Sequence, residues 1–127
     1  SRPFKNLRLH DEKTIFKFFN TLYFKAKEEY SFVNSQCNST SSPFADLDSR
    51  FLIANKSGIF FVSANISVHK FEKYFAIGSG CDYALGAIHA LYDLDYSAKE
   101  ICRQAILTGM ALNIHCGGHP DLREIKL

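Results

Sequence analysis

The sequence from residue 74 to residue 91, Tyr-Phe-Ala-Ile-Gly-Ser-Gly-Cys-Asp-Tyr-Ala-Leu-Gly-Ala-Ile-His-Ala-Leu, is the most informative part of the chain. Its apolar start, Tyr74–Ile77, predicts a short strand, and Gly78, Ser79 and Gly80 predict a turn that leads directly into a helix. Because glycine has no Cβ, the backbone N–H groups of such a turn can approach another group closely. The start of a helix adds partial positive charge at the same place. The turn is therefore the first candidate for a functional site.

Further towards the N-terminus, residues 11–30 predict a strongly amphipathic helix. The acidic residues Asp11 and Glu12 suit a helix start. Apolar side chains then recur at helical spacing, with lysines between them, and the predicted buried face consists of Ile15, Phe18, Phe19, Leu22, Tyr23 and Ala26. Residues 1–10 predict an irregular lead-in, and residues 34–49 predict a long polar loop.

Between this loop and the Gly-Ser-Gly turn, the pattern predicts a small antiparallel sheet. Two apolar runs, Arg50–Ala54 and Ile59–Ser63, are separated by Asn-Lys-Ser-Gly at residues 55–58, which is typical of a hairpin turn. A third extended piece around Ile66–Val68 is expected to lead into the strand at residues 74–77. Phenylalanine occurs 12 times and tryptophan is absent, which indicates a core dominated by phenylalanine.

After the turn, the sequence predicts two helices and a last strand. The first helix is expected to run to about Tyr92 and to bury Ala84, Ala87 and Leu91. A capping box, Ser-Ala-Lys-Glu at residues 97–100, predicts the start of the second helix. The side of this helix expected to be buried carries Ile101, Ala105 and Leu112, with Ile106 beside them. Residues 121–127 predict an edge strand. Helices that follow a hairpin without βαβ alternation indicate the α+β class.

Composition excludes several classes of function. The chain has 127 residues, a net charge of +2 and no apolar run near the roughly 20 residues that span a bilayer. We therefore expect no nucleic-acid partner and no membrane partner. Because no secretory signal is visible, we expect a cytoplasmic protein in which the four cysteines, Cys37, Cys81, Cys102 and Cys116, are reduced.

Several other motifs are weak. The turn is neither a nucleophile elbow, since position 76 is alanine, nor a phosphate-binding loop, since no Gly-Lys-Ser/Thr follows. His115-Cys-Gly-Gly-His119 has spacing that suits zinc, but it lacks a second ligand pair, so we expect no metal and no cofactor. Cys81 and His89 would lie roughly 12 Å apart on one helix, too far for a catalytic pair. Ser1 is a poor N-terminal nucleophile because proline at position 3 disfavours a strand there.

Residues 50–127 resemble the C-terminal part of a proteasome β-type N-terminal-nucleophile hydrolase, nearest to the HslV peptidase. The resemblance rests on the hairpin, on Ala-Ile-Gly-Ser-Gly at 76–80 with Tyr-Ala at 83–84, on the alanine-rich helix, and on Ser-Ala-Lys-Glu-Ile at 97–101. Short uncharacterised bacterial and phage members of the superfamily are more similar still. They end with Asn, a few residues and Gly-Gly-Pro before a final strand, and the counterpart here is Asn113 to Pro120 with a histidine inserted.

The resemblance implies a four-layer α-β-β-α sandwich, of which residues 1–127 are a single domain or the C-terminal two-thirds. It implies a threonine-type peptidase subunit whose nucleophile lies outside this sequence. Ser79 would be an accessory catalytic residue beside that nucleophile, and Gly78 and Gly80 would be binding residues. The implied partners are a peptide or protein substrate, identical subunits in a ring, and an ATPase.

Two alternatives remain open at the level of sequence. Residues 1–49 do not match the strands that carry the threonine and lysine in this family, and an ungapped alignment puts Ala111 where the peptidases have an acidic residue. The chain is then either a fragment of the enzyme or a non-catalytic assembly subunit on the same fold. A third interpretation is a small α/β module that binds an anion at the helix start after Gly80.

Overall fold

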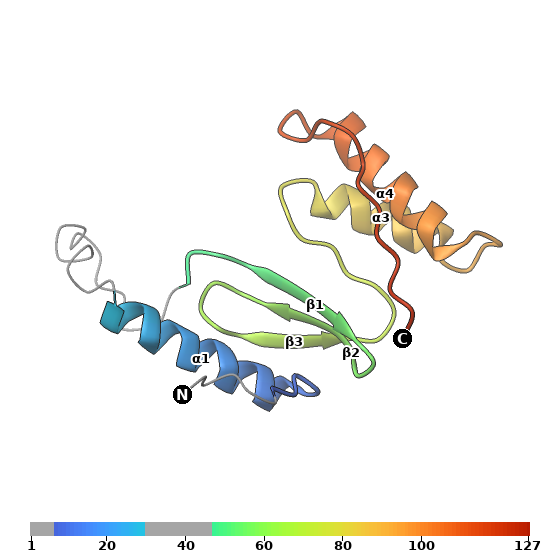
Figure 1. Cartoon of the computed structure of the whole chain (residues 1–127). Coiled ribbons are helices and arrows are strands. Elements are labelled where there is room, and N and C mark those ends of the chain that lie inside the picture. Colours follow the sequence, from blue (N-terminus) through green and yellow to red (C-terminus); the bar gives the residue numbers. More distant parts are fainter. Residues whose placement is uncertain (1–6, 30–46) are drawn as a thin grey trace. The chain divides into compact units, whose positions relative to one another are not determined.

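The computed structural model describes residues 7–29 and 47–127, which divide into two compact units (Figure 1). The first extends to Glu72 and the second begins at Lys73. The first unit contains the helix α1 (Glu12–Glu29) and the strands β1 (Phe51–Asn55), β2 (Gly58–Val62) and β3 (Val68–Phe71). The second contains the helices α3 (Cys81–Leu91) and α4 (Ala98–Leu112).

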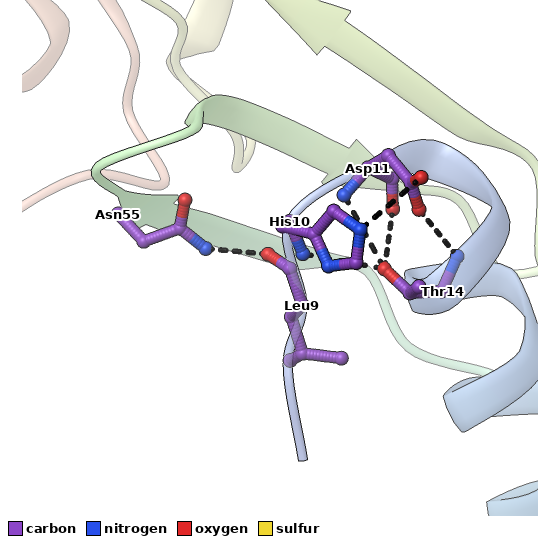
Figure 2. Close-up of polar contacts among 5 residues, drawn as sticks. All are labelled: Leu9, His10, Asp11, Thr14 and Asn55. Atoms are coloured by element: carbon purple, nitrogen blue, oxygen red, sulfur yellow. Dashed lines mark hydrogen bonds and ion pairs between the residues drawn. The ribbon is translucent and has the colours of Figure 1, made fainter.

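Helix α1 starts as its sequence predicts, through side chains at its N-terminus (Figure 2). The Asp11 carboxylate accepts a hydrogen bond of 2.8 Å from the backbone N–H of Thr14, and the Thr14 hydroxyl oxygen accepts one from the backbone N–H of Asp11 at 3.3 Å. The two residues thus satisfy N–H groups that a helix start leaves unpaired. The Thr14 backbone N–H, followed by the Thr14 side chain, holds the pKa of the Asp11 carboxyl below its ordinary value.

The three strands form one antiparallel sheet in the order β1-β2-β3. Asn55 pairs with Gly58, so the predicted hairpin and its turn at residues 55–58 are confirmed. The Asn55 side-chain amide also donates a hydrogen bond of 2.7 Å to the Leu9 carbonyl oxygen, which ties the hairpin to the segment ahead of α1 (Figure 2). The third strand begins at Val68 and is therefore shifted from the extended piece expected around Ile66–Val68.

The core of the first unit is formed between α1 and the sheet. Its buried side chains are at most 4% exposed and are Ile15, Phe19, Phe60, Val62 and Ile66. Phe19 packs its ring 4.8 Å from that of Phe51. On β2, Phe60 and Val62 are buried and the intervening Phe61 is only half-buried, as expected when one face of a sheet meets a helix.

Ile66 has an unusual backbone for a buried residue. It has a φ of 60°, in the left-handed region that β-branched residues rarely adopt, yet it is only 3% exposed. Hydrogen bonds around it fix the turn: Ser63 exchanges main-chain bonds with Ser67 and Ile66, at 2.9 and 3.0 Å, and its hydroxyl bonds the side chain of Asn65. The local strain is therefore offset by burial and by these bonds.

The second unit is a pair of packed helices with a small core. Ile88, Ile101 and Ala105 are buried, and Ala84, Ala87 and Leu91 pack against them as predicted. Ser97 caps α4 by accepting a hydrogen bond of 3.2 Å from the Glu100 backbone N–H, which confirms the predicted start. The N-terminal end of α3 approaches the C-terminal half of α4, where Gly80 meets Gly109. The two helices therefore run in opposite directions.

Two predicted strands are wrong. Residues 74–77 and 121–127 are irregular, and within residues 7–29 and 47–127 no strand pairs with either segment. Both segments have apolar side chains that suit a strand, but a strand also needs a partner for its N–H and C=O groups. Tyr74 instead packs against the helix pair.

Two predicted core positions are also wrong. Leu112 is 59% exposed, because it lies beyond Gly109, and Gly109 already meets Gly80 at the start of α3. Ala26 is exposed near the end of α1. The predictions for Ser1, Tyr30, Cys37 and most of the loop at 34–49 lie outside the described residues.

Candidate functional site

The Gly-Ser-Gly turn forms the wall of a cavity in the second unit. This cavity has a volume of about 350 Å³ and lies between the turn, the two helices and the segment after α4. Ile77, Ala84, Ala105 and Ile106 give it apolar walls, whereas Ser79 and Cys116 supply polar atoms. The sequence-based candidate residues Gly78, Ser79 and Gly80 all line it. A concave site with a few convergent polar groups is the usual form of a ligand site.

Both glycines of the turn are required by its geometry. Gly78 has a φ of 110°, which places it in the region that favours glycine. Gly80 is buried, and a Cβ added there would lie 2.8 Å from Cys116 Sγ and 3.5 Å from the Gly109 Cα atom. The turn can therefore lie this close to α4 and Cys116 because position 80 carries no side chain.

Ser79 is held by two residues from the end of α4. Its carbonyl oxygen accepts a hydrogen bond of 2.7 Å from the Asn113 side-chain amide, and the Asn113 side-chain oxygen accepts one of 2.8 Å from the His115 backbone N–H. The Ser79 hydroxyl lies 3.4 Å from Cys116 Sγ, within hydrogen-bond distance for sulfur. Ser79 is an exposed residue that lines the cavity.

The helix that follows the turn starts without a side-chain cap. Gly80 is the N-cap of α3, and no side chain accepts a hydrogen bond there. The Cys81 backbone N–H bonds the Gly78 carbonyl oxygen at 3.1 Å, which closes the turn. The first turn of α3 thus brings backbone N–H groups to the same end of the helix as Ser79.

The remaining candidates are not brought together. Cys81 Sγ lies 3.8 Å from an Asp82 carboxylate oxygen, whereas His89 Nδ1 pairs with the Tyr74 hydroxyl at 2.8 Å, so Cys81 and His89 have different partners. His115 and His119 both line the cavity. Over residues 7–29 and 47–127, however, no three His, Cys, Asp or Glu side chains are grouped closely enough to bind a metal ion. No helix of the described chain is both long and apolar enough to cross a bilayer.

Asn113 and Cys116 stood in motifs that the sequence analysis quoted, but their contacts with Ser79 were not predicted. The alignment-based expectation concerned Ala111, but the structure places Asn113 against Ser79, and Ala111 does not line the cavity. The available signal was the end of α4, since Asn113 is its C-cap and Gly117-Gly118 follows at once. Residues just after a helix can turn back over a neighbouring helix start.

The solved structures similar to this chain include two of one bacterial protein. One is Thiobacillus denitrificans BPH, with a TM-score of 0.72 and 32% sequence identity, and the other is the same protein in complex with epoxomicin, with a TM-score of 0.73 and 32% identity. Each alignment covers 89% of this chain, which is more than either compact unit contains. This chain spans 57% of the length of each solved chain. No protein-family model matches it.

Proposed function

We propose that this chain is the C-terminal part of a proteasome-like or HslV-like threonine-type peptidase subunit. The observation that carries the proposal is the 32% identity to BPH over 89% of the chain, in a protein that has been solved with epoxomicin, a proteasome inhibitor. The position of Ser79, exposed at a cavity and held through its carbonyl and hydroxyl, supports it. The proposed fold of the complete domain is the four-layer α-β-β-α sandwich.

In the proposed reaction, a residue upstream of this sequence supplies the nucleophile. Its hydroxyl attacks the peptide carbonyl, and its own α-amine accepts the proton, as in other enzymes with an N-terminal nucleophile. Backbone N–H groups stabilise the oxyanion that forms. Ser79 contributes a hydroxyl beside the nucleophile; Asn113 holds the Ser79 carbonyl oxygen, and Cys116 contacts the hydroxyl. Gly78, where nothing lies within 4 Å of a Cβ, allows the backbone to lie close to the substrate, and Gly80 takes part in binding through its position in the same turn.

The proposed partners follow from the same similarity. We expect a peptide or protein substrate, association of identical subunits into a ring, and an ATPase that delivers substrate. The large apolar side chains left exposed in the second unit are compatible with subunit contacts, among them Leu94, Leu112, Ile114 and Ile125. Cytoplasmic location belongs to this proposal as well.

The test uses the protein expressed from its complete reading frame. After processing, intact mass and N-terminal sequencing are expected to show an exposed Thr, Ser or Cys upstream of Ser1. An epoxyketone probe is expected to label that residue, and a fluorogenic peptide is expected to be cleaved. Ser79→Ala is expected to lower kcat by about tenfold to a hundredfold, because a misplaced nucleophile costs this much. Ser57→Ala, in the β1–β2 turn of the other unit, is the matched control.

Other outcomes would favour the alternatives. A ring that neither reacts with the epoxyketone nor cleaves peptides would be an assembly subunit. The uncapped start of α3 is the observation that favours an anion-binding module. A monomer that binds inorganic phosphate, and loses this binding in Ser79→Pro, would establish that module and exclude the peptidase.

A further inference from the structure

Two thiols line the cavity beside Ser79. Cys81 is the first residue of α3 and Cys116 lies in the segment after α4, and both are half-buried free thiols. They are far apart in sequence but belong to the same wall, since the Asn113 amide bonds the Ser79 carbonyl and so joins the two segments that carry them. Cys102, by contrast, is exposed on α4 and does not line the cavity.

The position of Cys116 brings its sulfur close to the residue preceding Cys81. A Cβ at Gly80 would lie 2.8 Å from Cys116 Sγ, so this sulfur sits against the backbone at the start of α3. The Cys116 sulfur contacts the Ser79 hydroxyl at 3.4 Å, and the Cys81 sulfur contacts the Asp82 carboxylate at 3.8 Å. Neither residue belongs to the buried apolar core, and both line the cavity.

From this arrangement we infer that Cys81 and Cys116 form a dithiol modification site, which peroxides oxidise reversibly to a disulfide. In the first step the Cys116 sulfur attacks hydrogen peroxide, an S–O bond forms, the O–O bond breaks, and water leaves with Cys116 as a sulfenic acid. In the second step the Cys81 sulfur attacks this sulfur, the S–O bond breaks and a second water leaves. The two thiols lose two electrons and two protons, and one peroxide becomes two waters.

This site would control the proposed peptidase, and that consequence rests on the proposed function. A disulfide turns the Cys116 sulfur towards Cys81 and removes its S–H group, so the Ser79 hydroxyl loses a partner that can donate or accept. The bridge also draws the start of α3 towards the segment after α4. Oxidation is then expected to lower peptidase activity, and a dithiol reductant is expected to restore it.

The experiment treats the full-length protein with hydrogen peroxide, blocks free thiols with iodoacetamide and maps peptides without reduction. The expected result is a linked pair of peptides containing Cys81 and Cys116, lighter than the reduced pair by two hydrogen atoms. Alkylation of these two residues is expected to fall at least about tenfold, while that of the exposed control Cys102 changes less than about twofold. In Cys81→Ser, dimedone is expected to trap a sulfenic acid on Cys116. Linkage through another cysteine, or no linkage, would overturn the inference.

The two proposals fail separately. If the disulfide forms but the protein neither cleaves peptide nor reacts with an epoxyketone, the dithiol site stands and the peptidase proposal is wrong. If peptide is cleaved at the same rate in the oxidised and reduced protein, the peptidase stands and control through the thiols is wrong. Cys102→Ser is expected to keep the peroxide response, which would exclude a general effect of oxidation.

Discussion

The two compact units are stabilised in different ways. The first buries large side chains between a helix and a sheet, and Ile15, Phe60 and Val62 have no exposed surface. In the second unit the buried hydrophobic side chains are Ile88, Ile101 and Ala105, each with some surface left. At its candidate site the backbone of Gly80 lies against that of Gly109. The stability of the first unit thus depends on large buried side chains. The site of the second unit depends instead on glycines, which let two backbone segments lie close together.

This difference predicts opposite responses to substitution. Removing atoms should damage the first unit, because a close-packed core responds to a cavity. Adding atoms should damage the site of the second unit, because its close approach leaves no room for a methyl group. The following predictions test this contrast, each in the full-length protein.

The largest effect is expected from Phe60→Ala. Phe60 is fully buried in β2, so its removal leaves a cavity under α1 and should lower the free energy of unfolding by about 3–5 kcal/mol. Urea unfolding measures this. Phe24→Ala is the matched control: Phe24 is 54% exposed on α1, and its loss should change stability by less than about 1 kcal/mol. Equal effects of the two variants would show that the first unit is not held by its core.

A smaller effect is expected from Gly80→Ala. The added Cβ would contact Cys116 Sγ at 2.8 Å, so stability should fall by about 1–3 kcal/mol. Gly86→Ala should instead be neutral or raise stability by up to about 1 kcal/mol, because nothing lies within 4 Å of a Cβ at that helix position. In a Cys116→Ala background the cost of Gly80→Ala should shrink. A cost that stays unchanged there would show that Cys116 is not the obstacle.

The smallest effect concerns pH and the start of α1. Hydrogen bonds from Thr14 lower the pKa of Asp11 from its ordinary value of 3.8. A carboxyl with a lowered pKa in the folded state stabilises the fold above its unfolded pKa, and this contribution is lost as the pH falls through the folded pKa. Wild type should therefore be more stable than Asp11→Ala at neutral pH, and the difference should decrease in acid. For Asp11→Asn, which keeps a capping oxygen but cannot titrate, no such change relative to Asp11→Ala is expected.

The parts of the fold that depend on local signals could be predicted from sequence. Helix α1, the hairpin, and the start of α4 at Ser97 each follow from a periodicity, a turn or a cap within a few residues. Local signals could not show whether residues 74–77 form a strand, because a strand needs a hydrogen-bonding partner that can be distant in sequence. The prediction that Leu112 is buried was wrong for a related reason, since its burial depends on where the start of α3 lies along α4.

The candidate site was predictable in part for the same reason. The glycines around Ser79 can be recognised from the turn itself, and all three residues do line one cavity. Asn113 and Cys116 are more than 30 positions away, and only the packing of α3 against α4 brings them to Ser79. The local sequence marks the end of α4 at Asn113 and the glycines that follow, but it does not show which helix start these residues contact.

The turn at Ile66 has a consequence for how the first unit opens. The left-handed backbone conformation is unfavourable for a β-branched residue. Ile66 therefore keeps it only while burial of its side chain in the core offsets this cost. When the core loosens, relaxation at position 66 would release the main-chain bonds between Ser63 and Ser67. Core substitutions should therefore speed hydrogen exchange at the Ser63 and Ile66 amides. Milder substitutions should be enough to do so there than at the amides that pair β1 with β2.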